Sequence, residues 1–377
     1  MSVENYQEFR PGVLNQDQIL SLKGHVIDHL NDKDVDLSAF NLHLSRYGHE
    51  MKGSMKASCH EDIDKIIGDY SKNRLPDNGP WTLHTGKIYI FRLQEYLTLP
   101  KEGMFFGNAT GKSSIGRLDV LTRLMVNNCP YFDTIEDKSY KGSLYLEVTP
   151  ITFPIRVQEG DALSQLRLFR GLPEWSELKD DQLPLFGPMI LKEDGQPKAE
   201  NETDLTVNLT PDKNGISAFG TKEKEETKDG NLVVDLTQGE KSHDPKKFWD
   251  PERPNKNGEL EIEPERFYIL RSKERFKLPP DVAVYCQAIS ETLGELRIHY
   301  AGFVHPGFGL DQDNGTPIIF EVRGHNVKVI LRDGETLARI KFYRMSQPCR
   351  EPCLKEKKSG YEEQELKLSK YFWDWPK

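Results

Sequence analysis

The sequence has few cysteines and no long apolar run, and these absences argue against two classes of protein: disulfide-stabilised proteins and proteins with membrane-spanning helices. Only 5 of the 377 residues are cysteine, an odd number at mostly wide spacings, so we expect free thiols and no disulfide framework. No stretch approaches the roughly 18 apolar residues that a membrane helix needs, so we expect no membrane partner. Residues 1–5 lack the basic and apolar character of a secretory signal, and the expected compartment is therefore the cytoplasm.

The chain also lacks an excess of positive charge. Its 51 Lys and Arg residues stand against 60 Asp and Glu residues, a formal net charge of −9. Sequence-independent binding to duplex DNA depends on a broad surface of Lys and Arg. We therefore expect no nucleic-acid partner, and any anionic ligand must be met by a local basic pocket.

The sequence is instead rich in short apolar or alternating stretches, separated by Gly, Pro, Asn and Asp. This pattern predicts a mainly β protein with a few short helices. Helices are expected at 15–22, where Asn15 can act as N-cap, and at 61–70. The predicted strands are 87–93, 142–148, 162–169, 266–270, 282–287, 318–322, 327–331 and 336–343.

The two halves of the chain echo each other weakly. Segments 97–100, 115–118, 146–148, 158–160 and 163–166 correspond in order and approximate spacing to 276–279, 293–296, 320–322, 332–334 and 337–340. Such a long repeat indicates duplication of a whole small β domain. A polar, Pro-rich stretch between them reads as a linker. We therefore expect one β domain at 1–171, a linker at 172–202 and a second β domain at 203–377.

One short segment of the first half has the chemistry of a phosphate site. A nucleoside triphosphate carries about four negative charges, so its site needs backbone NH groups, hydroxyls and cations. Gly111 allows close backbone approach, Lys112 and Arg117 add positive charge, and Ser113 and Ser114 add hydroxyls. By itself the segment also fits an ordinary surface turn.

The second half contains a glycine- and aromatic-rich stretch at 299–309, His-Tyr-Ala-Gly-Phe-Val-His-Pro-Gly-Phe-Gly. This composition suits a tight hairpin whose backbone reads the edge of a base. A β-turn with aromatic residues in the core is the alternative reading.

Together these motifs resemble the dUTPase and dCTP deaminase superfamily: 111–118 is similar to its phosphate-binding motif and 299–309 to its nucleoside-binding hairpin. Flanking segments at 12–14, 37–42, 89–91, 244–250, 267–270 and 366–370 extend the resemblance over nearly the whole chain. It points to the long, two-repeat type of dCTP deaminase, and implies tandem dUTPase-like distorted β-barrels. Each half keeps the motif that the other lacks, so we expect a composite site, within one chain or between two chains of a homo-oligomer.

The resemblance also implies roles for individual residues. In this family a glutamate on the strand after the hairpin is the general base, and Glu321 matches it, with Glu147 as its counterpart in the first half. The implied catalytic residues are Glu321, Arg117, Ser113 and Glu147. The implied substrate-binding residues are Gly111, Lys112, Ser114, Arg297, His299, Ala301, Gly302, His305 and Gln364.

No metal-binding motif for a zinc deaminase is present. That signature combines His-x-Glu with Pro-Cys-x-x-Cys, whereas the segment 348–353, Pro-Cys-Arg-Glu-Pro-Cys, has one residue too many between its cysteines, and the chain has no His-x-Glu. We therefore expect no zinc. Mg²⁺ is expected only as an ion bound through the phosphates of a deoxynucleoside triphosphate substrate.

Three functions stay open at this stage. The first is zinc-independent deamination of dCTP to dUTP and ammonia; the second is dUTP diphosphatase activity, alone or after deamination. The third is a catalytically silent nucleotide-binding protein, because His305 and Asn41 stand where the family has Asp. In the tail, 361–366 carries three glutamates that would repel a triphosphate, leaving Gln364 as the expected contact there.

Overall fold

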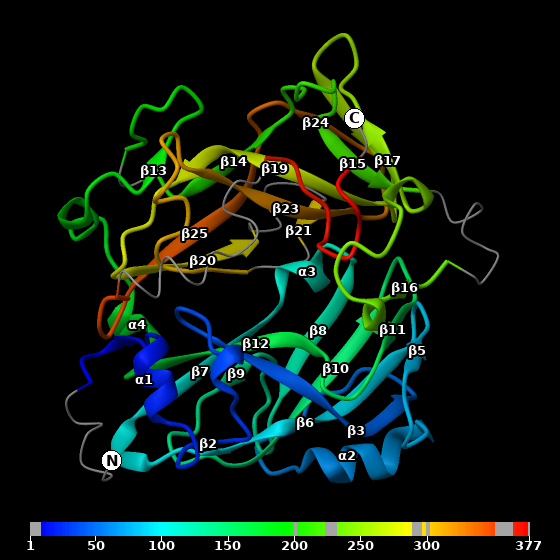
Figure 1. Ribbon diagram of the computed structural model, residues 1–377, viewed down its shortest axis with the longest axis vertical. Helices are drawn as coiled ribbons and strands as arrows, with labels where there is room; N and C mark the ends of the chain where they lie inside the picture. The colour runs from blue at the N-terminus through cyan, green and yellow to red at the C-terminus, as the bar shows by residue number, and fades with distance from the viewer. Residues whose placement is uncertain are drawn as a thin grey trace.

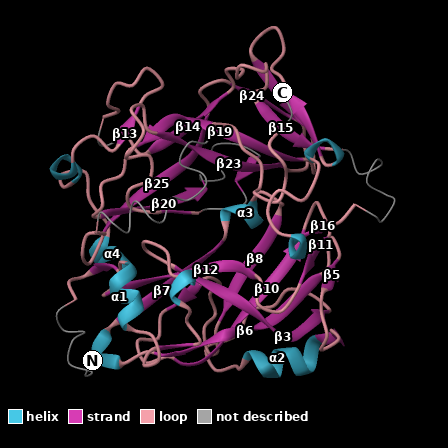
Figure 2. Ribbon diagram, in the orientation of Figure 1, coloured by secondary structure: helices cyan, strands magenta, loops and turns pink. Residues whose placement is uncertain are grey.

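The computed structural model describes residues 9–199, 202–222, 232–288, 296–298, 302–350 and 365–375. Two ten-stranded sheets, one from each half of the chain, dominate this part of the molecule. Figure 1 shows the first half in blue to green below the second half in yellow to orange, and Figure 2 shows how little of either is helical. The prediction of a mainly β fold with two barrel-like sheets and a few short helices is confirmed.

The first sheet has seven strands along its main path and three more off this path. Along the path the strands are β8 (Val120–Met125), β10 (Lys141–Pro150), β6 (Ile88–Thr98), β3 (Phe40–Met51), β12 (Ala162–Arg170), β7 (Phe105–Gly111) and β9 (Thr134–Ile135). The additional strands are β1 (Gly12–Val13), β2 (Ile27–Asp28) and β4 (Ser71–Arg74), which pair with β12, β6 and β3. All of these pairings are antiparallel.

The second sheet repeats this plan with strands from residues 190–344. Along its path lie β17 (Trp249–Glu252), β15 (Ala218–Thr221), β19 (Phe267–Phe276), β14 (Asp204–Asn208), β25 (Thr336–Arg344), β20 (Val282–Ala288) and β22 (Phe303–Val304). Off the path are β13 (Ile190–Leu191), β21 (Leu296–Ile298) and β23 (Thr316–Gly324), and β23 pairs with β19 and β21. A separate two-stranded sheet joins β18 (Glu259–Ile262) to β24 (Val329–Arg332).

The helices are short and lie at the ends of strands. They are α1 (Gln16–Ser21), α2 (Ile63–Tyr70), α3 (Ser113–Gly116) and α4 (Pro173–Ser176), with single turns of 3-10 helix at Asp32–Asp34, Lys101–Gly103, Leu183–Phe186, Leu236–Gln238 and Pro245–Lys247. Asn15 caps α1 as predicted, since its side chain accepts from the Gln18 NH and Gln18 reaches back to the Asn15 NH, a capping box. The longest described helix, α2, has eight residues, so none of the described helices is long enough to cross a membrane.

Several features connect the halves. A small sheet joins β5 (Trp81–Leu83) and β11 (Ile155–Val157) of the first half to β16 (Val234–Asp235) of the second. A continuous hydrophobic core also passes between them, where Phe153 packs edge-on against Phe248 and Trp249. The stretch 172–202, predicted to be a linker, carries α4 and β13, and β13 pairs with β19. The domain boundaries at 171 and 203 stay a prediction.

Candidate active site

The phosphate-site segment lies where the two halves meet. Strand β7 ends at Gly111, the Lys112 NH donates to the Leu163 carbonyl at 3.0 Å, and α3 begins at Ser113. Figure 1 shows α3 between the two sheets, beside β21 and β23. Residues of this segment line a cavity of about 710 Å³, whose other walls come from the second half and from the end of the chain. The structure therefore builds this cavity from both halves within one chain.

Glu321 forms part of the wall opposite α3. It lies on β23, paired with Ile269 of β19, and its side chain is buried. Its Oε1 lies 3.9 Å from Nε of Arg117. Its carboxylate also packs directly against the backbone of Gly116, where any Cβ would collide with it. The glycine thus lets a carboxylate of the second half approach the helix of the first.

The environment of Glu321 changes its acidity. Burial, opposed by the positive charge of Arg117 and assisted by nearby Asp119, raises the pKa of Glu321 to about 8. At neutral pH the side chain is therefore mostly protonated. A carboxyl group with a pKa near the working pH can both take up and release a proton, which is what general acid–base catalysis requires.

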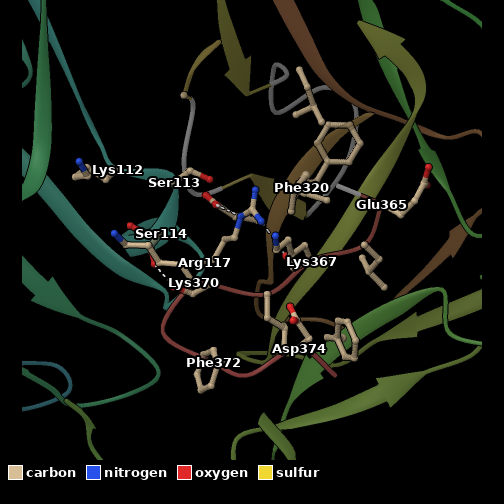
Figure 3. Close-up of a pocket in the computed structure, with 18 of the residues that line it drawn as sticks. Lys112, Ser113, Ser114, Arg117, Phe320, Glu365, Lys367, Lys370, Phe372 and Asp374 are labelled. Atoms are coloured by element: carbon tan, nitrogen blue, oxygen red, sulfur yellow. Dashed lines mark hydrogen bonds and ion pairs between the residues drawn. The ribbon is translucent and has the colours of Figure 1, made fainter. Parts of the chain in front are cut away.

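Arg117 is buried and is held by the end of the chain. Residues 365–375, which we call the C-terminal strap, cross the cavity beside α3. Nη1 of Arg117 donates to the Lys367 carbonyl at 2.9 Å, and the Ser369 hydroxyl donates to the Ser114 carbonyl at 2.6 Å. Figure 3 shows the Arg117 guanidinium between Ser113 and the strap residues Lys367 and Lys370. The strap therefore fixes both the helix and its arginine.

Lys112 lies on the other side of the segment. Its Nζ donates to Oδ1 of Asn41, and Nδ2 of Asn41 donates to Asp34 at 3.3 Å. Burial, together with the nearby charge of Lys370, lowers the pKa of Lys112 to about 8 against the opposing charges of Asp36 and Asp34. An anionic ligand beside Lys112 would stabilise the charged form of its amine.

An ion pair between the halves supports the same region. Arg323 follows Glu321 by two residues on β23, and its Nη2 donates to Asp119, just after α3. Thr152 completes the group: its hydroxyl donates to Asp119 at 2.5 Å and accepts from Arg323 at 2.6 Å. The contact of Arg323 with Asp119 is buried, where a charge needs a partner, and the two contacts of Thr152 are partly buried. The pair therefore fixes β23, and with it Glu321, relative to α3.

The residues of the predicted hairpin that the structure describes also reach the cavity. Gly302 and His305 line it, together with Phe303 and Val304 of β22. Nδ1 of His305 lies 2.9 Å from the Ser38 hydroxyl, and its Nε2 lies 3.7 Å from Asp36. The described residues 302–305 thus face the phosphate-site segment across one cavity.

Of the predicted site residues, the structure brings together Gly111, Lys112, Ser113, Ser114, Arg117, Gly302, His305 and Glu321. Ser113 is exposed, whereas Ser114 is buried. His299, Ala301 and Gln364 lie outside the described residues, and of Arg297 only the backbone in β21 is described. The roles assigned to all of these residues stay predictions.

Glu147, the counterpart of Glu321 in the first half, is not among the residues that line the cavity. It is buried on β10 next to Arg123, whose Nη1 lies 3.9 Å from its Oε1, and that oxygen accepts from Ser54 at 3.0 Å. Burial raises the pKa of Glu147. Glu147 therefore resembles Glu321 in burial, but its neighbours Ser54 and Arg123 both belong to its own half of the chain.

Sequence reasoning missed several residues that shape the site. Gly116 belongs to the 111–118 motif but was given no role of its own, and Asp119, Arg323 and Cys286, which lines the cavity close to Glu321, carry no signal beyond ordinary strand and turn composition. Of the three tail glutamates expected to repel a triphosphate, Glu362 and Glu363 lie outside the described residues, and Glu365 pairs with Arg271 and Arg275, each at 2.9 Å. Its charge is therefore neutralised by the second sheet.

Comparisons with known proteins agree with this geometry. The family model of the 2'-deoxycytidine 5'-triphosphate deaminase (DCD) N-terminal domain matches residues 10–172, and that of the C-terminal domain matches residues 180–372. Among solved structures, the chain is similar to the crystal structure of 2'-deoxycytidine 5'-triphosphate deaminase from Agrobacterium tumefaciens, with 29% sequence identity and a TM-score of 0.79. That match covers 90% of this chain and 100% of the other. No curated protein matches the sequence.

Proposed function

The chain belongs to the 2'-deoxycytidine 5'-triphosphate deaminase family, and on this premise we propose that it hydrolyses dCTP to dUTP and ammonia at the cavity between its two halves. One observation carries the assignment of the site. The buried carboxyl of Glu321 lies against α3 and faces Arg117 of the phosphate-site segment. A proton-transfer group and an anion-binding segment are thus placed on one cavity, as deamination of a triphosphate requires.

In the proposed reaction, water adds to C4 of cytosine and ammonia leaves. Ionised Glu321 takes one proton from the attacking water as the C4–O bond forms and delivers it to ring N3. It then carries the second proton from the C4 hydroxyl to the amino group, so that the C4–N bond breaks, the C4 carbonyl of uracil forms, and one ammonia is released for the one water consumed. Arg117 favours the ionised form of Glu321. This positive charge keeps a fraction of the carboxyl able to act as base at neutral pH.

The triphosphate would lie along α3 and Lys112. Lys112 and Arg117 supply cations, and the NH groups and hydroxyls of Ser113 and Ser114 supply donors. We propose that Mg²⁺ enters with the substrate, bound through its phosphates. Glu147 has no part in this scheme because it does not line the cavity.

Three finer predictions remain proposals. Independence from zinc is supported by Cys349, which lies in an apolar cluster with Val13 and Phe106 and donates through its thiol to the Leu37 carbonyl at 3.3 Å. The cytoplasm as compartment and a homo-oligomer as the working form rest on the sequence. Light scattering of the purified protein would measure the oligomeric state.

The test is incubation of the purified protein with dCTP and Mg²⁺ after treatment with a zinc chelator. We expect dUTP and ammonia in equal amounts, and Glu321→Gln should abolish turnover while the protein still binds dCTP. Release of pyrophosphate from dUTP would instead indicate diphosphatase activity. Thermal stabilisation by dCTP without any product would show a nucleotide-binding protein that lacks the proposed activity.

A further inference from the structure

Arg167 is a fully buried arginine that reaches from the first half of the chain into the second. It lies on β12, and its Nη1 donates to the Val284 carbonyl of β20 at 3.2 Å, while its Nη2 donates to the Val304 carbonyl of β22 at 3.4 Å. Burial lowers the pKa of Arg167 to about 9, and its Nε has no hydrogen-bond partner in the described part of the molecule. Such a residue costs folding free energy compared with an apolar side chain, which favours a role other than stability.

The guanidinium also supports a residue of the cavity wall. Its central carbon lies 3.9 Å from the ring centroid of Phe303, a close cation–π contact. On the other side, Phe303 packs against Tyr285 with ring centroids 5.7 Å apart. Phe303 and Val304 both line the cavity. Arg167 therefore holds β22 through the ring of Phe303 and the carbonyl of Val304.

A third contact of Arg167 leads to His305. Nη2 of Arg167 donates to the Ser38 hydroxyl at 3.1 Å, and the same hydroxyl lies 2.9 Å from Nδ1 of His305. An arginine can only donate, so the Ser38 oxygen accepts from it. In the described part of the chain, Nδ1 of His305 is the one acceptor in reach of the Ser38 hydrogen. The hydroxyl therefore donates to Nδ1, and the proton of neutral His305 is on Nε2, on the side of Asp36.

We propose that Arg167 is a positioning residue for the deamination reaction: through Ser38 it selects the Nε2–H tautomer of His305, and through Phe303 and Val304 it holds β22 as a wall of the cavity. The proposal rests on the proposed function for its kinetic consequences. The tautomer itself is a property of the free protein and can be measured without turnover.

The first experiment is ¹⁵N–¹H NMR of protein labelled at histidine, recorded near pH 8.5 so that the imidazoles are neutral. The signal of His305, one of ten histidines, is identified by its absence in His305→Gln. We expect the Nε2–H pattern in the wild type and a mixture of tautomers in Ser38→Ala and Arg167→Met. An Nδ1–H pattern in the wild type, or an unchanged pattern in both variants, overturns the proposal.

The second experiment compares kcat and KM for dCTP in Arg167→Met, Arg167→Lys and Ser38→Ala. The matched control is Arg170→Met, which removes an arginine from the same strand at a position that does not line the cavity. We expect Arg167→Met to lower kcat/KM at least tenfold, mainly through KM, and Arg167→Lys to recover part of the loss by restoring a cationic donor. Ser38→Ala should lower kcat/KM several-fold, and Arg170→Met should match the wild type.

Failure of the proposed function and failure of the proposed role of Arg167 give different experimental results. If the wild type binds dCTP but forms no dUTP, the proposed function is wrong. The role of Arg167 is then decided by the tautomer measurement and by the affinity of each variant for dCTP, which replaces kcat/KM. If the wild type deaminates dCTP and both Arg167→Met and Ser38→Ala keep its kcat/KM, Arg167 has no positioning role. Equal losses in Arg167→Met and Arg170→Met would likewise overturn the proposal, because they would indicate a general effect on folding.

Discussion

The carboxyl group of Glu321 packs against Gly116, and its Oε1 lies 3.9 Å from Nε of Arg117. Glu321 belongs to a strand of the second sheet, whereas Gly116 and Arg117 belong to a short helix region of the first half. Neither half by itself contains this arrangement. The proposed chemistry therefore depends on how the two sheets are docked, and each prediction below tests one contact of that docking.

The first prediction concerns the pH dependence of deamination. Burial raises the pKa of Glu321 to about 8, and only the ionised carboxylate can take a proton from water. About one tenth of Glu321 is ionised one pH unit below this pKa and about nine tenths one unit above it. We therefore expect kcat for dCTP to rise roughly tenfold between pH 7 and pH 9, because kcat reports the enzyme–substrate complex, in which the bound triphosphate keeps Lys112 charged. Re-assay at pH 8 after each incubation controls for denaturation, and a flat profile would contradict the role of Glu321 as base.

The second prediction is that Gly116→Ala strongly reduces activity. A Cβ at this position would lie 2.9 Å from Cδ of Glu321 and would displace the carboxyl group from α3. We expect kcat/KM to fall at least a hundredfold in a folded protein, because small displacements of a catalytic group are costly.

Gly68→Ala is the matched control for this change. Gly68 also lies in a helix, α2, but a Cβ there meets no atom within 4 Å. The substitution should leave kcat/KM unchanged and stabilise the protein by up to about 1 kcal/mol through helix propensity. Wild-type activity in Gly116→Ala would show that the close approach of Glu321 to α3 is not needed.

Many strands with apolar or alternating stretches were predictable from the sequence, although β8 was missed despite its alternating burial pattern. All eight predicted strands overlap observed ones, and both predicted helices are present. The long strand β3 was missed because its pattern is broken: its pairing with β6 shifts between Leu44 and Gly48, and it contains polar residues such as Arg46 and His49. A bulge moves side chains to the other face of the sheet, and this removes the alternation on which prediction depends.

The site was predictable in composition and only partly in geometry. The sequence shows Glu147 and Glu321 at equivalent positions, yet only Glu321 faces α3, because that choice is made by the docking of the two sheets. The strap contacts were also hidden, since Arg117 binds the Lys367 backbone carbonyl, an acceptor that every residue possesses. Side-chain motifs therefore identify the segments of the site, whereas the contacts between these segments can be identified only from the structure.

The third prediction is that Glu321→Gln stabilises the protein more at high pH than at low pH. The pKa of Glu321 is raised from 4.5 in the unfolded chain to about 8 in the folded protein, so ionisation disfavours the fold. The wild type should lose stability relative to Glu321→Gln as the pH rises from about 4.5 to about 8, by on the order of a few kcal/mol. Urea unfolding of both proteins at pH 5 and pH 9 measures this gap, and a gap independent of pH would show that the pKa is not raised.

The fourth prediction concerns the buried pair of Asp119 and Arg323. Asp119→Asn leaves the guanidinium of Arg323 without its buried anionic partner and only the exposed Glu265 at 3.7 Å as an anionic neighbour, and we expect a loss of roughly 3 kcal/mol in the free energy of unfolding. Asp119 also raises the pKa of Glu321, so the rise of kcat with pH should move to lower pH in this variant.

Glu261→Gln is the control for the loss of a carboxylate. Glu261 pairs with Lys328 at 3.0 Å on the surface, where an ion pair contributes little to stability. The pH dependence of dCTP deamination by Glu261→Gln should match that of the wild type. Equal stabilities of Asp119→Asn and Glu261→Gln would contradict a structural role for the pair between the halves.

The last prediction tests whether the C-terminal strap positions the phosphate-site segment. The Ser369 hydroxyl donates to the Ser114 carbonyl at 2.6 Å in the interior, and Ser369→Ala removes this bond. Ser217 makes an equivalent buried bond of 2.6 Å to the Leu209 carbonyl in the second half. Both alanine variants should lose about 1 kcal/mol of stability, but only Ser369→Ala should raise the KM for dCTP several-fold, because only that bond holds α3. Equal KM values in the two variants would show that the contact of the strap with Ser114 stabilises the fold but does not position α3 for substrate binding.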